Sequence, residues 1–476
     1  MELETIIGLE IHAQISSATK MFCSCANNSF GKEANTNVCP ICMAFPGMLP
    51  VINEEAVRKG AIAALALGCE IPQHSKFDRK NYFYPDLPPG FQISQYDEPI
   101  SKEGKLEINL EEGKKTIRII RLHLENDAGK LTHTSGGTLL DFNRAGCPLM
   151  EIVSYPDMRS SKEARAYAEA VQKILRYCGS SDCDMEKGMM RFDASVSLRP
   201  KGEENLYPRA EIKNLNSFRS LEAAIEYEVS RQKEMWEKGA PLASEQTVGW
   251  DDERGTTQVL REKESAADYR YFPEPDLPPV EISEAQLTEW RKQVPESPME
   301  KYERFMSSFE LGEAEARFLS EDPDLARYFE EVVQKSGNHK SAAAFVGTVL
   351  VKRLKDEGKW MNDSPVTAEQ LAELIQLVDK GEISNNVAKS TVFDEMMKSS
   401  KNPAAIVEEL GLTQKSDAGE IEKWCQTAIA AHPQAAADVK AGTMKAIGTL
   451  VGAVMKESKG QANPKMVNEV LMKLLV

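Results

Sequence analysis

Acidic and basic side chains recur at every second position of several short segments, beginning with residues 7–14. Glu10 and His12 are separated there by one residue, and apolar residues occupy the alternate positions. Because residues i and i+2 of a strand project from the same face, Glu10 and His12 are expected to lie together, opposite a face that packs on the core. In residues 119–125 the same alternation places Ile120 with Leu122 and Leu124 on the apolar face. The polar residues of this segment and of residues 190–199 and 209–213 include Arg121, His123, Glu125, Arg191, Asp193, Arg209, Glu211 and Lys213.

Carboxylates gathered on one sheet face could bind a metal ion and, with it, a nucleotide. Hard carboxylate oxygens are the ligands that Mg²⁺ prefers, and nearby lysines and arginines can hold phosphate groups. Glu151 adds to this set because it interrupts the apolar run 148–153, where an acid is costly to bury unless something neutralises it. For any single strand the alternative is a solvated face of an antiparallel sheet. The repetition favours a metal site, although spacing alone does not show that the strands are neighbours or name a reaction.

Two cysteine pairs, Cys23-x-Cys25 and Cys39-x-x-Cys42, are separated by thirteen residues. Four thiolates from two such turns suit tetrahedral Zn²⁺, and four protein ligands would leave no open position, so the site would be structural. The alternative is four unrelated reduced thiols. The nine cysteines are an odd number in a long chain, which argues against a disulfide framework.

Residues 77–95 form an aromatic, proline-rich segment in which cations and rings interleave. Such side chains can stack on bases or contact phosphates. The alternative, equally weighted, is a packed connection whose rings anchor it to the core. The residues concerned are Arg79, Lys80, Tyr82, Phe83, Tyr84 and Phe91.

The elements that would position these residues change character near residue 295. Before it, short strands of period two are interrupted by two helices, expected over Ser160–Tyr177 and Ser217–Gly239 with the serines as N-caps. After it, the chain is rich in short amphipathic helical patterns. The pattern predicts an α+β fold with an antiparallel sheet, followed by all-helical regions.

Charge and hydropathy limit the partners of the chain. No apolar run approaches the length of a membrane span, and no signal peptide is apparent, so the cytoplasm is expected. The net charge of −16 argues against nucleic-acid binding by the chain as a whole. Residues 439–476, however, carry six lysines against two glutamates, so RNA binding would be possible there; the alternative is a solvated helical surface. P-loop, Rossmann and nucleophile-elbow motifs are absent.

Several long motifs are distributed along the chain. They are GLEIH at 8–12, FDRKNYFYPD at 77–86, QISQ at 92–95, DAGK at 127–130, PLMEIVS at 148–154, EIKNLNSF at 211–218, DYRYFPEPDL at 268–277, GTLVGAVMK at 448–456 and GQANP at 460–464. These motifs resemble those of the B subunits of aspartyl/glutamyl-tRNA(Asn/Gln) amidotransferases, and the likeness extends over essentially the whole chain. The resemblance implies a cradle-like catalytic domain at residues 1–294, a helical domain at 295–403 and a helical, tRNA-binding tail domain at 404–476.

The resemblance also implies a reaction. A ligase of this family uses ATP and Mg²⁺ to phosphorylate the side-chain carboxylate of Asp on tRNA(Asn) or Glu on tRNA(Gln), and ammonia then displaces the phosphate. The ammonia would come from glutamine hydrolysed by a separate amidase, the A subunit, and a small C subunit would complete a heterotrimer. Misacylated tRNA would be the substrate, and neither DNA nor a membrane is implied.

Roles are implied for residues that match the family motifs. Glu10, His12, Glu125 and Glu151 would be Mg²⁺ ligands, and Arg191 and Lys213, with Asp193 and Glu211 close by, would serve the nucleotide phosphates. Lys80, Tyr82 and Tyr84 would lie near the ammonia path or the activated carboxyl group. Cys23, Cys25, Cys39 and Cys42 would hold zinc, and Lys445, Lys456 and Lys459 would contact tRNA. The chain departs from the family pattern at Pro89, Asn126, Tyr155 and Met189.

Three other interpretations have less support. The related archaeal-type E subunit carries an inserted domain, for which this chain has no room. A non-catalytic, zinc-containing RNA-binding scaffold needs lysines rather than an inward-facing set of carboxylates. A metallohydrolase that acts without tRNA would leave the lysine-rich tail unexplained.

Overall fold

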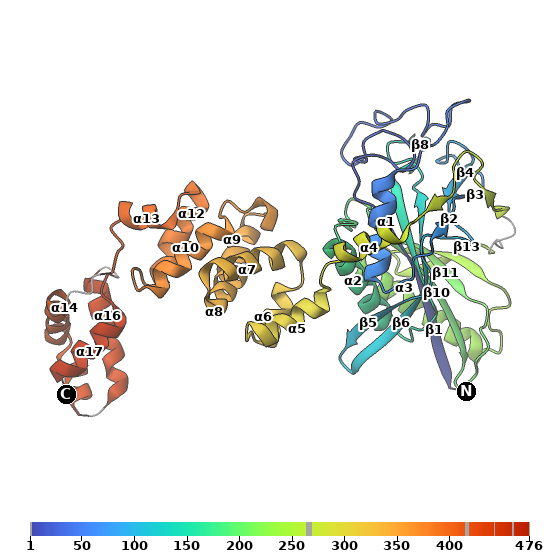
Figure 1. Cartoon of the computed structure of the whole chain (residues 1–476). Helices are drawn as coiled ribbons and strands as arrows, with labels where there is room; N and C mark the ends of the chain where they lie inside the picture. The colour runs from blue at the N-terminus through green and yellow to red at the C-terminus, as the bar shows by residue number, and fades with distance from the viewer. Residues whose placement is uncertain (1, 263–268, 415–417, 442, 459–460, 476) are drawn as a thin grey trace. The chain divides into compact units, whose positions relative to one another are not determined.

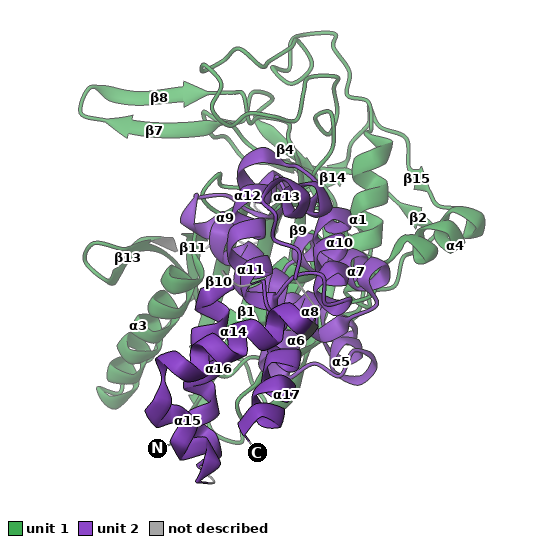
Figure 2. Cartoon of the chain, turned by 90° about the vertical axis from the view of Figure 1, so that its left-hand side faces the viewer, with its two compact units in different colours: residues 1–297 green, residues 298–476 purple. Residues whose placement is uncertain are grey.

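The computed structural model describes residues 2–262, 269–414, 418–441, 443–458 and 461–475. The chain divides into two compact units, Met1–Ser297 and Pro298–Val476, which are coloured separately in Figure 2. The unit boundary lies close to the expected change in composition. The further division at 403/404 stays a prediction, and residue 403 is the first residue of a helix, α13.

An eight-stranded sheet forms the centre of unit 1 (Figure 1). Its order is β13-β12-β11-β10-β1-β9-β6-β5, so β1 at the N-terminus lies between two strands that come much later in the chain. The strands are β1 Leu3–Gln14, β5 Gly104–Leu110, β6 Gly113–Asn126, β9 Pro148–Ser154, β10 Met190–Pro200, β11 Ala210–Leu215, β12 Gln246–Asp251 and β13 Thr256–Glu262.

The sheet is mixed rather than wholly antiparallel, which corrects one expectation. β11 and β12 pair in parallel, whereas the other neighbouring strands of this sheet pair antiparallel. The reason is helix α3 (Phe218–Glu237), which connects β11 to β12. A helical crossover returns the chain to the same end of the sheet, so the next strand runs in the same direction. The α+β class and the helical C-terminal region are confirmed.

Helices α1 (Glu54–Ala66), α2 (Ser161–Tyr177) and α3 pack against the apolar face of the sheet in one hydrophobic core. Both predicted helix starts are confirmed: the Ser160 hydroxyl accepts a hydrogen bond from the Glu163 backbone N–H, and Ser217 accepts one from Ser220. These caps satisfy backbone donors that the first helical turn leaves without partners.

The prediction that Ile120 faces the core is wrong. Ile119 pairs with Ser154 and Arg121 pairs with Val153, so Ile120 is an extra residue on β6, a β-bulge. Ile119 and Leu122 are both buried, whereas Ile120 is half-buried. The bulge changes the phase of the alternation between Ile119 and Leu122.

Smaller elements lie around the main sheet of unit 1. They are the three-stranded sheet β14 (Phe272–Pro273), β3 (Asp78–Asn81) and β4 (Phe91–Ser94), the hairpin β7 (Lys130–Thr134) and β8 (Gly137–Asp141), the pair β2 (His74–Ser75) and β15 (Val280–Glu281), and helix α4 (Glu284–Gln293).

The described elements of unit 2 are all helices, and those near its end share a separate hydrophobic core that includes Ile421, Leu450 and Leu471. No helix in the described ranges of the chain is long and apolar enough to cross a membrane. The helices are α5 Pro298–Ser308, α6 Glu313–Leu319, α7 Pro323–Ser336, α8 His339–Ala344, η2 Phe345–Leu350, α9 Val351–Asp356, η3 Met361–Asp363, α10 Ala368–Asp379, α11 Asn385–Val387, η4 Ala388–Val392, α12 Phe393–Ser399, α13 Pro403–Glu409, α14 Ala418–Ala431, α15 Pro433–Lys440, η5 Met444–Ala446, α16 Ile447–Glu457 and α17 Pro464–Leu475.

Candidate active site

Four neighbouring strands of the main sheet, β10, β1, β9 and β6, bring polar side chains from distant parts of the chain together. His12 on β1 pairs with Arg191 on one side and with Glu151 on the other, and Glu151 pairs in turn with His123. These four residues therefore form a row across the sheet. Glu10 occupies the next row, paired with Asp193. The apolar residues between them belong to the core, so the polar ones share the opposite face.

His12 lies between two groups of carboxylates. Its Nδ1 is 3.8 Å from a carboxylate oxygen of Glu125 and 3.8 Å from one of Glu151. Its Nε2 is 3.5 Å from Asp193, which forms the second group with Glu10. Within each group the possible ligand atoms lie within 4.8 Å of one another. The four predicted Mg²⁺ ligands therefore share one face, but they fall into two groups that meet at His12.

The His12 ring shows that these residues fit a bound cation. Its Nδ1 is buried and has no hydrogen-bond partner in the described part of the chain, although two carboxylates lie near it. A buried polar atom without a hydrogen-bond partner is unusual, and a bound ion or a water molecule would explain it. A metal ion held by Glu125 and Glu151 beside His12 would supply one and would neutralise the two buried acids.

The charges of the cluster favour a positive ion. Burial by itself would lower the pKa of His12, but Glu151, Asp193 and Glu125 outweigh it and raise that pKa to about 10. Burial would raise the pKa of Glu151, yet His123 and His12 lower it to about 2. Without a metal, Glu125, Glu151 and Asp193 are thus ionised and hold the imidazole in its charged form, whereas burial raises the pKa of Glu10.

The two cations predicted for phosphate already have acidic partners. Lys213 Nζ lies 2.8 Å from Asp193, 2.5 Å from Glu211 and 3.8 Å from Glu10. Arg191 donates to Asp127 at 3.4 Å. Both cations border the acidic face, and an incoming phosphate would share them with these carboxylates.

Lys80, on β3, points its ammonium toward two tyrosine rings. Its Nζ lies 5.0 Å from the ring centre of Tyr269 and 5.8 Å from that of Tyr82. Burial lowers the pKa of Lys80, but Tyr271, Glu125 and Glu151 outweigh burial and raise it, which places this ammonium in the field of the acidic cluster. Tyr84 is 55% exposed, and no hydrogen bond or ring contact of the described residues joins its side chain to Lys80 or Glu125.

The four predicted zinc ligands converge. The sulfur atoms of Cys23, Cys25, Cys39 and Cys42 lie within 4.8 Å of one another, and all four thiols are free of disulfides. The Cys42 sulfur accepts a hydrogen bond from the Cys39 backbone N–H at 3.2 Å. A hydrogen bond from Cys23 is the largest influence that lowers the pKa of Cys42, to about 5. Such a cluster, with one thiol poised to ionise, is compatible with a structural metal ion.

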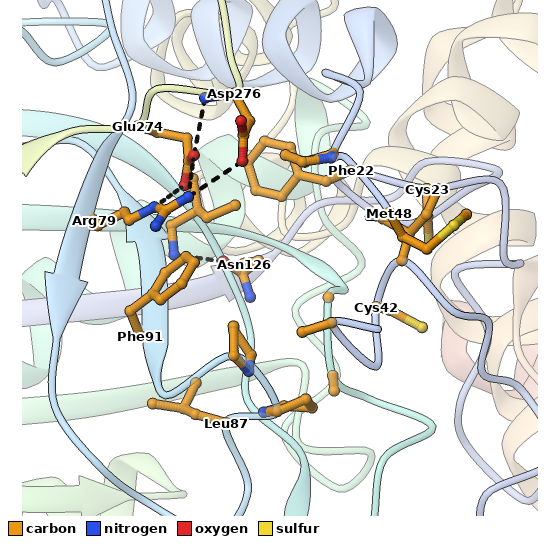
Figure 3. A pocket seen from close by; sticks show the side chains of 18 of the residues that line it. Phe22, Cys23, Cys42, Met48, Arg79, Leu87, Phe91, Asn126, Glu274 and Asp276 are labelled. Atoms are coloured by element: carbon orange, nitrogen blue, oxygen red, sulfur yellow. Dashed lines mark hydrogen bonds and ion pairs between the residues drawn. The ribbon is translucent and has the colours of Figure 1, made fainter. Parts of the chain in front are cut away.

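A pocket of about 270 Å³ lies between this cysteine loop and the β3–β4 hairpin (Figure 3). On one side Arg79 donates to Glu274 at 2.7 and 2.8 Å and to Asp276 at 3.2 Å, and its guanidinium stacks on Phe91. The pocket reaches Asp127 but neither Glu10 nor His12, so it lies beside the acidic cluster rather than over it.

Two protein-family models match this chain over most of its length. Residues 5–288 match the GatB/GatE catalytic domain, and residues 327–475 match the GatB domain. The chain belongs to the GatB/GatE family. The acidic face and the four cysteines all fall within the match to the GatB/GatE catalytic domain. Lys445 and Lys456 are exposed within the GatB-domain match, whereas Lys459 lies outside the described residues.

Several full-length relatives of this GatB/GatE chain are named as B subunits of aspartyl/glutamyl-tRNA(Asn/Gln) amidotransferase. The protein from Persephonella marina is 49% identical over 476 residues, which cover 100% of both chains. That from Thermodesulfovibrio yellowstonii is 48% identical over the same share of both chains. That from Carboxydothermus hydrogenoformans is 47% identical over 99% of this chain and 98% of its own.

Three residues of this GatB/GatE site were not among the predicted site residues. His123 Nε2 lies 3.4 Å from Glu151 and 3.7 Å from Glu125. The alternation that selected Glu125 also placed His123 on this face and could have found it. Asp127 lies beyond the end of β6, and Ser94 donates to Glu125 from β4 at 3.2 Å. Strand periodicity does not predict either residue, because only tertiary contacts bring Asp127 and Ser94 to the site.

Proposed function

We propose that this chain is the subunit of a glutamine-dependent amidotransferase that activates the amino acid on misacylated tRNA. The γ-phosphoryl group of ATP is transferred to the side-chain carboxylate of Asp-tRNA(Asn), Glu-tRNA(Gln) or both, which releases ADP. Ammonia then attacks the acyl phosphate and expels phosphate, leaving the amide. The names of the full-length relatives support this reaction.

The observation that carries the proposal is the convergence of Glu125 and Glu151 on His12, whose Nδ1 lacks a hydrogen-bond partner among the described residues. Mg²⁺ bound among these residues and Glu10 would neutralise phosphate charge, so that a carboxylate can approach a triphosphate. Arg191 and Lys213, held by Asp127 and Asp193, border the space where the phosphates would lie.

Lys80 is assigned to the substrate side of the reaction. Its charge, directed toward the acidic cluster and flanked by Tyr82 and Tyr269, would orient the activated carboxyl group. Tyr82, and Tyr84 from the exposed loop, would border the path by which ammonia arrives. The four cysteines would hold a structural Zn²⁺ ion.

We further infer that the chain works in a cytoplasmic heterotrimer with an amidase A subunit and a small C subunit. The amidase would supply the ammonia, and the lack of a nucleophile-elbow motif in this sequence supports a separate subunit for glutamine hydrolysis. The exposed lysines Lys445 and Lys456 would contact the tRNA phosphates.

The variant Glu125→Gln tests the proposed site in the reconstituted three-subunit enzyme. It removes one charge from a buried cluster and keeps the shape of the side chain. Transfer of labelled γ-phosphate to Glu-tRNA(Gln) and Asp-tRNA(Asn) is expected to fall at least about 100-fold, as for loss of a group that stabilises transferred charge. Glutamine hydrolysis by the amidase should persist.

Glu163→Gln is the matched control, because Glu163 is a carboxylate on α2 that pairs with Lys115. It should transfer phosphate at the unmodified rate. Amide formation on either tRNA at a normal rate by the Glu125→Gln enzyme would refute the assignment of this cluster.

A further inference from the structure

Lys20 is a fully buried lysine beside the four-cysteine cluster. Its side chain is 0% exposed, which is rare for an ammonium group. Its Nζ donates to the backbone carbonyl of Asn37 at 2.9 Å and to the Cys42 sulfur at 3.7 Å. Among the described residues, no carboxylate forms an ion pair with it. The charge of Lys20 is therefore enclosed with one neutral carbonyl and one thiol as hydrogen-bond partners.

A buried charge needs an opposite charge nearby, because desolvation is costly and a carbonyl supplies only a dipole. Cys147 is not the source, since burial raises the pKa of its thiol to about 12. Asp127 in the same region is engaged by Arg191 and Arg144. This leaves the four-cysteine cluster, which Lys20 contacts through Cys42, as the source of negative charge.

The local backbone is shaped for this contact. Gly146 has φ +87°, and a Cβ added there would lie 3.5 Å from Lys20 Cδ and 3.4 Å from Cys42 Cβ. Its carbonyl accepts the Met21 backbone N–H at 2.8 Å, which ties the residue after Lys20 to this turn. The added Cβ would meet both at ordinary van der Waals distance, so the positive φ favours glycine here, and residue 146 packs against both the lysine stem and Cys42.

A loaded zinc site would be the negative partner of the buried Lys20 ammonium. A divalent ion held by four thiolates carries two net negative charges, and loading it onto thiols releases protons. A fixed cation beside the sulfur atoms stabilises the loaded state more than the empty one, because four thiolates around a divalent ion carry more negative charge than the empty cluster, in which Cys42 is the thiol with a lowered pKa. The same contact holds the Cys42 sulfur in place.

We propose that Lys20 is a positioning residue for the zinc site, where its ammonium balances the charge of the tetrathiolate and orients Cys42. This inference rests on the proposed zinc site. It adds that the site carries its own counter-charge, and that zinc retention depends on the charge of residue 20 rather than on the four cysteines alone.

The test compares zinc retention by the full-length chain and its variants. Lys20→Gln keeps a hydrogen-bond donor and removes the charge, whereas Lys20→Arg keeps the charge. Zinc per chain is measured by elemental analysis, and the rate of zinc release by transfer to a chromogenic chelator. Lys20→Gln is expected to release zinc at least about tenfold faster than the unmodified chain, as for other groups that support metal ligands. Lys20→Arg should release it more slowly than Lys20→Gln does.

Lys59→Gln is the matched control. Lys59 also donates to a backbone carbonyl of this unit, that of Ser16, but it pairs with Glu55 and contacts no thiol in the described structure. It should retain zinc normally. Circular dichroism in excess zinc checks folding, and Lys20→Met, which keeps the apolar stem, replaces any variant that does not fold.

Each outcome separates the two ideas. If the unmodified chain holds zinc and releases it at the same rate as Lys20→Gln and Lys20→Met, the role of Lys20 is overturned and the zinc site stands. Equally fast release by Lys20→Arg and Lys20→Gln also overturns the role of charge. An unmodified chain that holds no zinc, with four thiols open to alkylation, overturns the zinc site and this inference together.

Discussion

At the scale of single residues, charge balance explains which side chains of unit 1 remain available for chemistry. Lys213 and Arg191 are each paired with a carboxylate, so the acids Asp193 and Asp127 are already neutralised. Glu125 and Glu151, by contrast, are balanced chiefly by the imidazoles of His12 and His123, with the charges of Lys80 and Arg191 also acting on Glu125. Because an imidazole releases its proton far more readily than lysine or arginine does, Glu125 and Glu151 are the acids that an added cation can most readily take over.

The ion pair between Asp157 and Arg118, which lies outside the candidate site, allows a test of how a lowered pKa contributes to stability. Its carboxylate accepts from the Arg118 guanidinium at 2.7 and 2.9 Å and from the Arg118 backbone N–H at 3.1 Å. The hydrogen bonds from Arg118 are the largest influence that lowers the pKa of Asp157. Because its folded-state pKa is lowered, this acid stabilises the fold above about pH 4, the unfolded value, and the contribution disappears as the pH falls through the folded value.

We therefore expect Asp157→Asn to reduce the free energy of unfolding at pH 7 by about 1 kcal/mol, a modest amount because Arg118 is largely exposed. Urea unfolding at pH 7 and at pH 3 measures the effect. The difference between the variant and the unmodified chain should shrink at pH 3. A difference that grows with acidity would show that the pKa of Asp157 is raised, contrary to the structure.

At the scale of elements, the acidic face depends on helices that hold the strands from behind. Gly60 of α1 lies against Leu124 of β6, whose neighbours His123 and Glu125 project into the site. A Cβ at position 60 would stand 2.6 Å from Leu124 Cδ2. Leu124 is fully buried in a close-packed core, so a shift of its side chain has to displace other core side chains.

We expect Gly60→Ala to destabilise unit 1 by about 1–3 kcal/mol, the usual cost of overpacking a core, despite the better helix propensity of alanine. Scanning calorimetry of the full chain would show a lower temperature for the unfolding of unit 1. Gly452→Ala on α16 is the control, since nothing lies within 4 Å of its added Cβ. It should leave the chain as stable as before or slightly more stable, and equal effects of the two changes would contradict the close packing of α1 on β6.

At the scale of the whole molecule, the proposed function requires different charges in its two units. Unit 1 presents carboxylates for a metal ion, whereas exposed lysines gather near the end of unit 2. A chain of net charge −16 repels RNA on average, so binding depends on where its lysines lie.

Lys445→Ala and Lys456→Ala together are expected to weaken tRNA binding by the assembled enzyme. They should also reduce the slope of log K against log salt by about 1 for each phosphate that the protein no longer neutralises. Filter binding of tRNA over a range of salt concentrations measures both quantities. Lys380→Ala, which removes an exposed lysine just after α10, is the control. If the double variant keeps the original slope, the tail lysines do not contact tRNA phosphates.

The sequence alone determined the local properties of this protein. The period of two assigned Glu10 and His12 to one strand face, and Ser160 and Ser217 predicted where two helices begin, because these properties depend only on neighbouring residues. The cysteine spacing was also sufficient to predict the four-thiol cluster, because two close pairs only thirteen residues apart can converge within one loop. The resemblance to a known family added the reaction.

Only the tertiary structure decided which strand faces meet. His12 lies between Arg191 and Glu151 because β1 pairs with β10 and β9, and such long-range pairing leaves no periodic signal in the sequence. The bulge at Ile120 broke the alternation that sequence reasoning assumed to continue. The burial of Lys20 against Cys42 likewise follows from the packing of the segment around Gly146, since a lone lysine is expected from sequence to be exposed until a neighbouring segment encloses it.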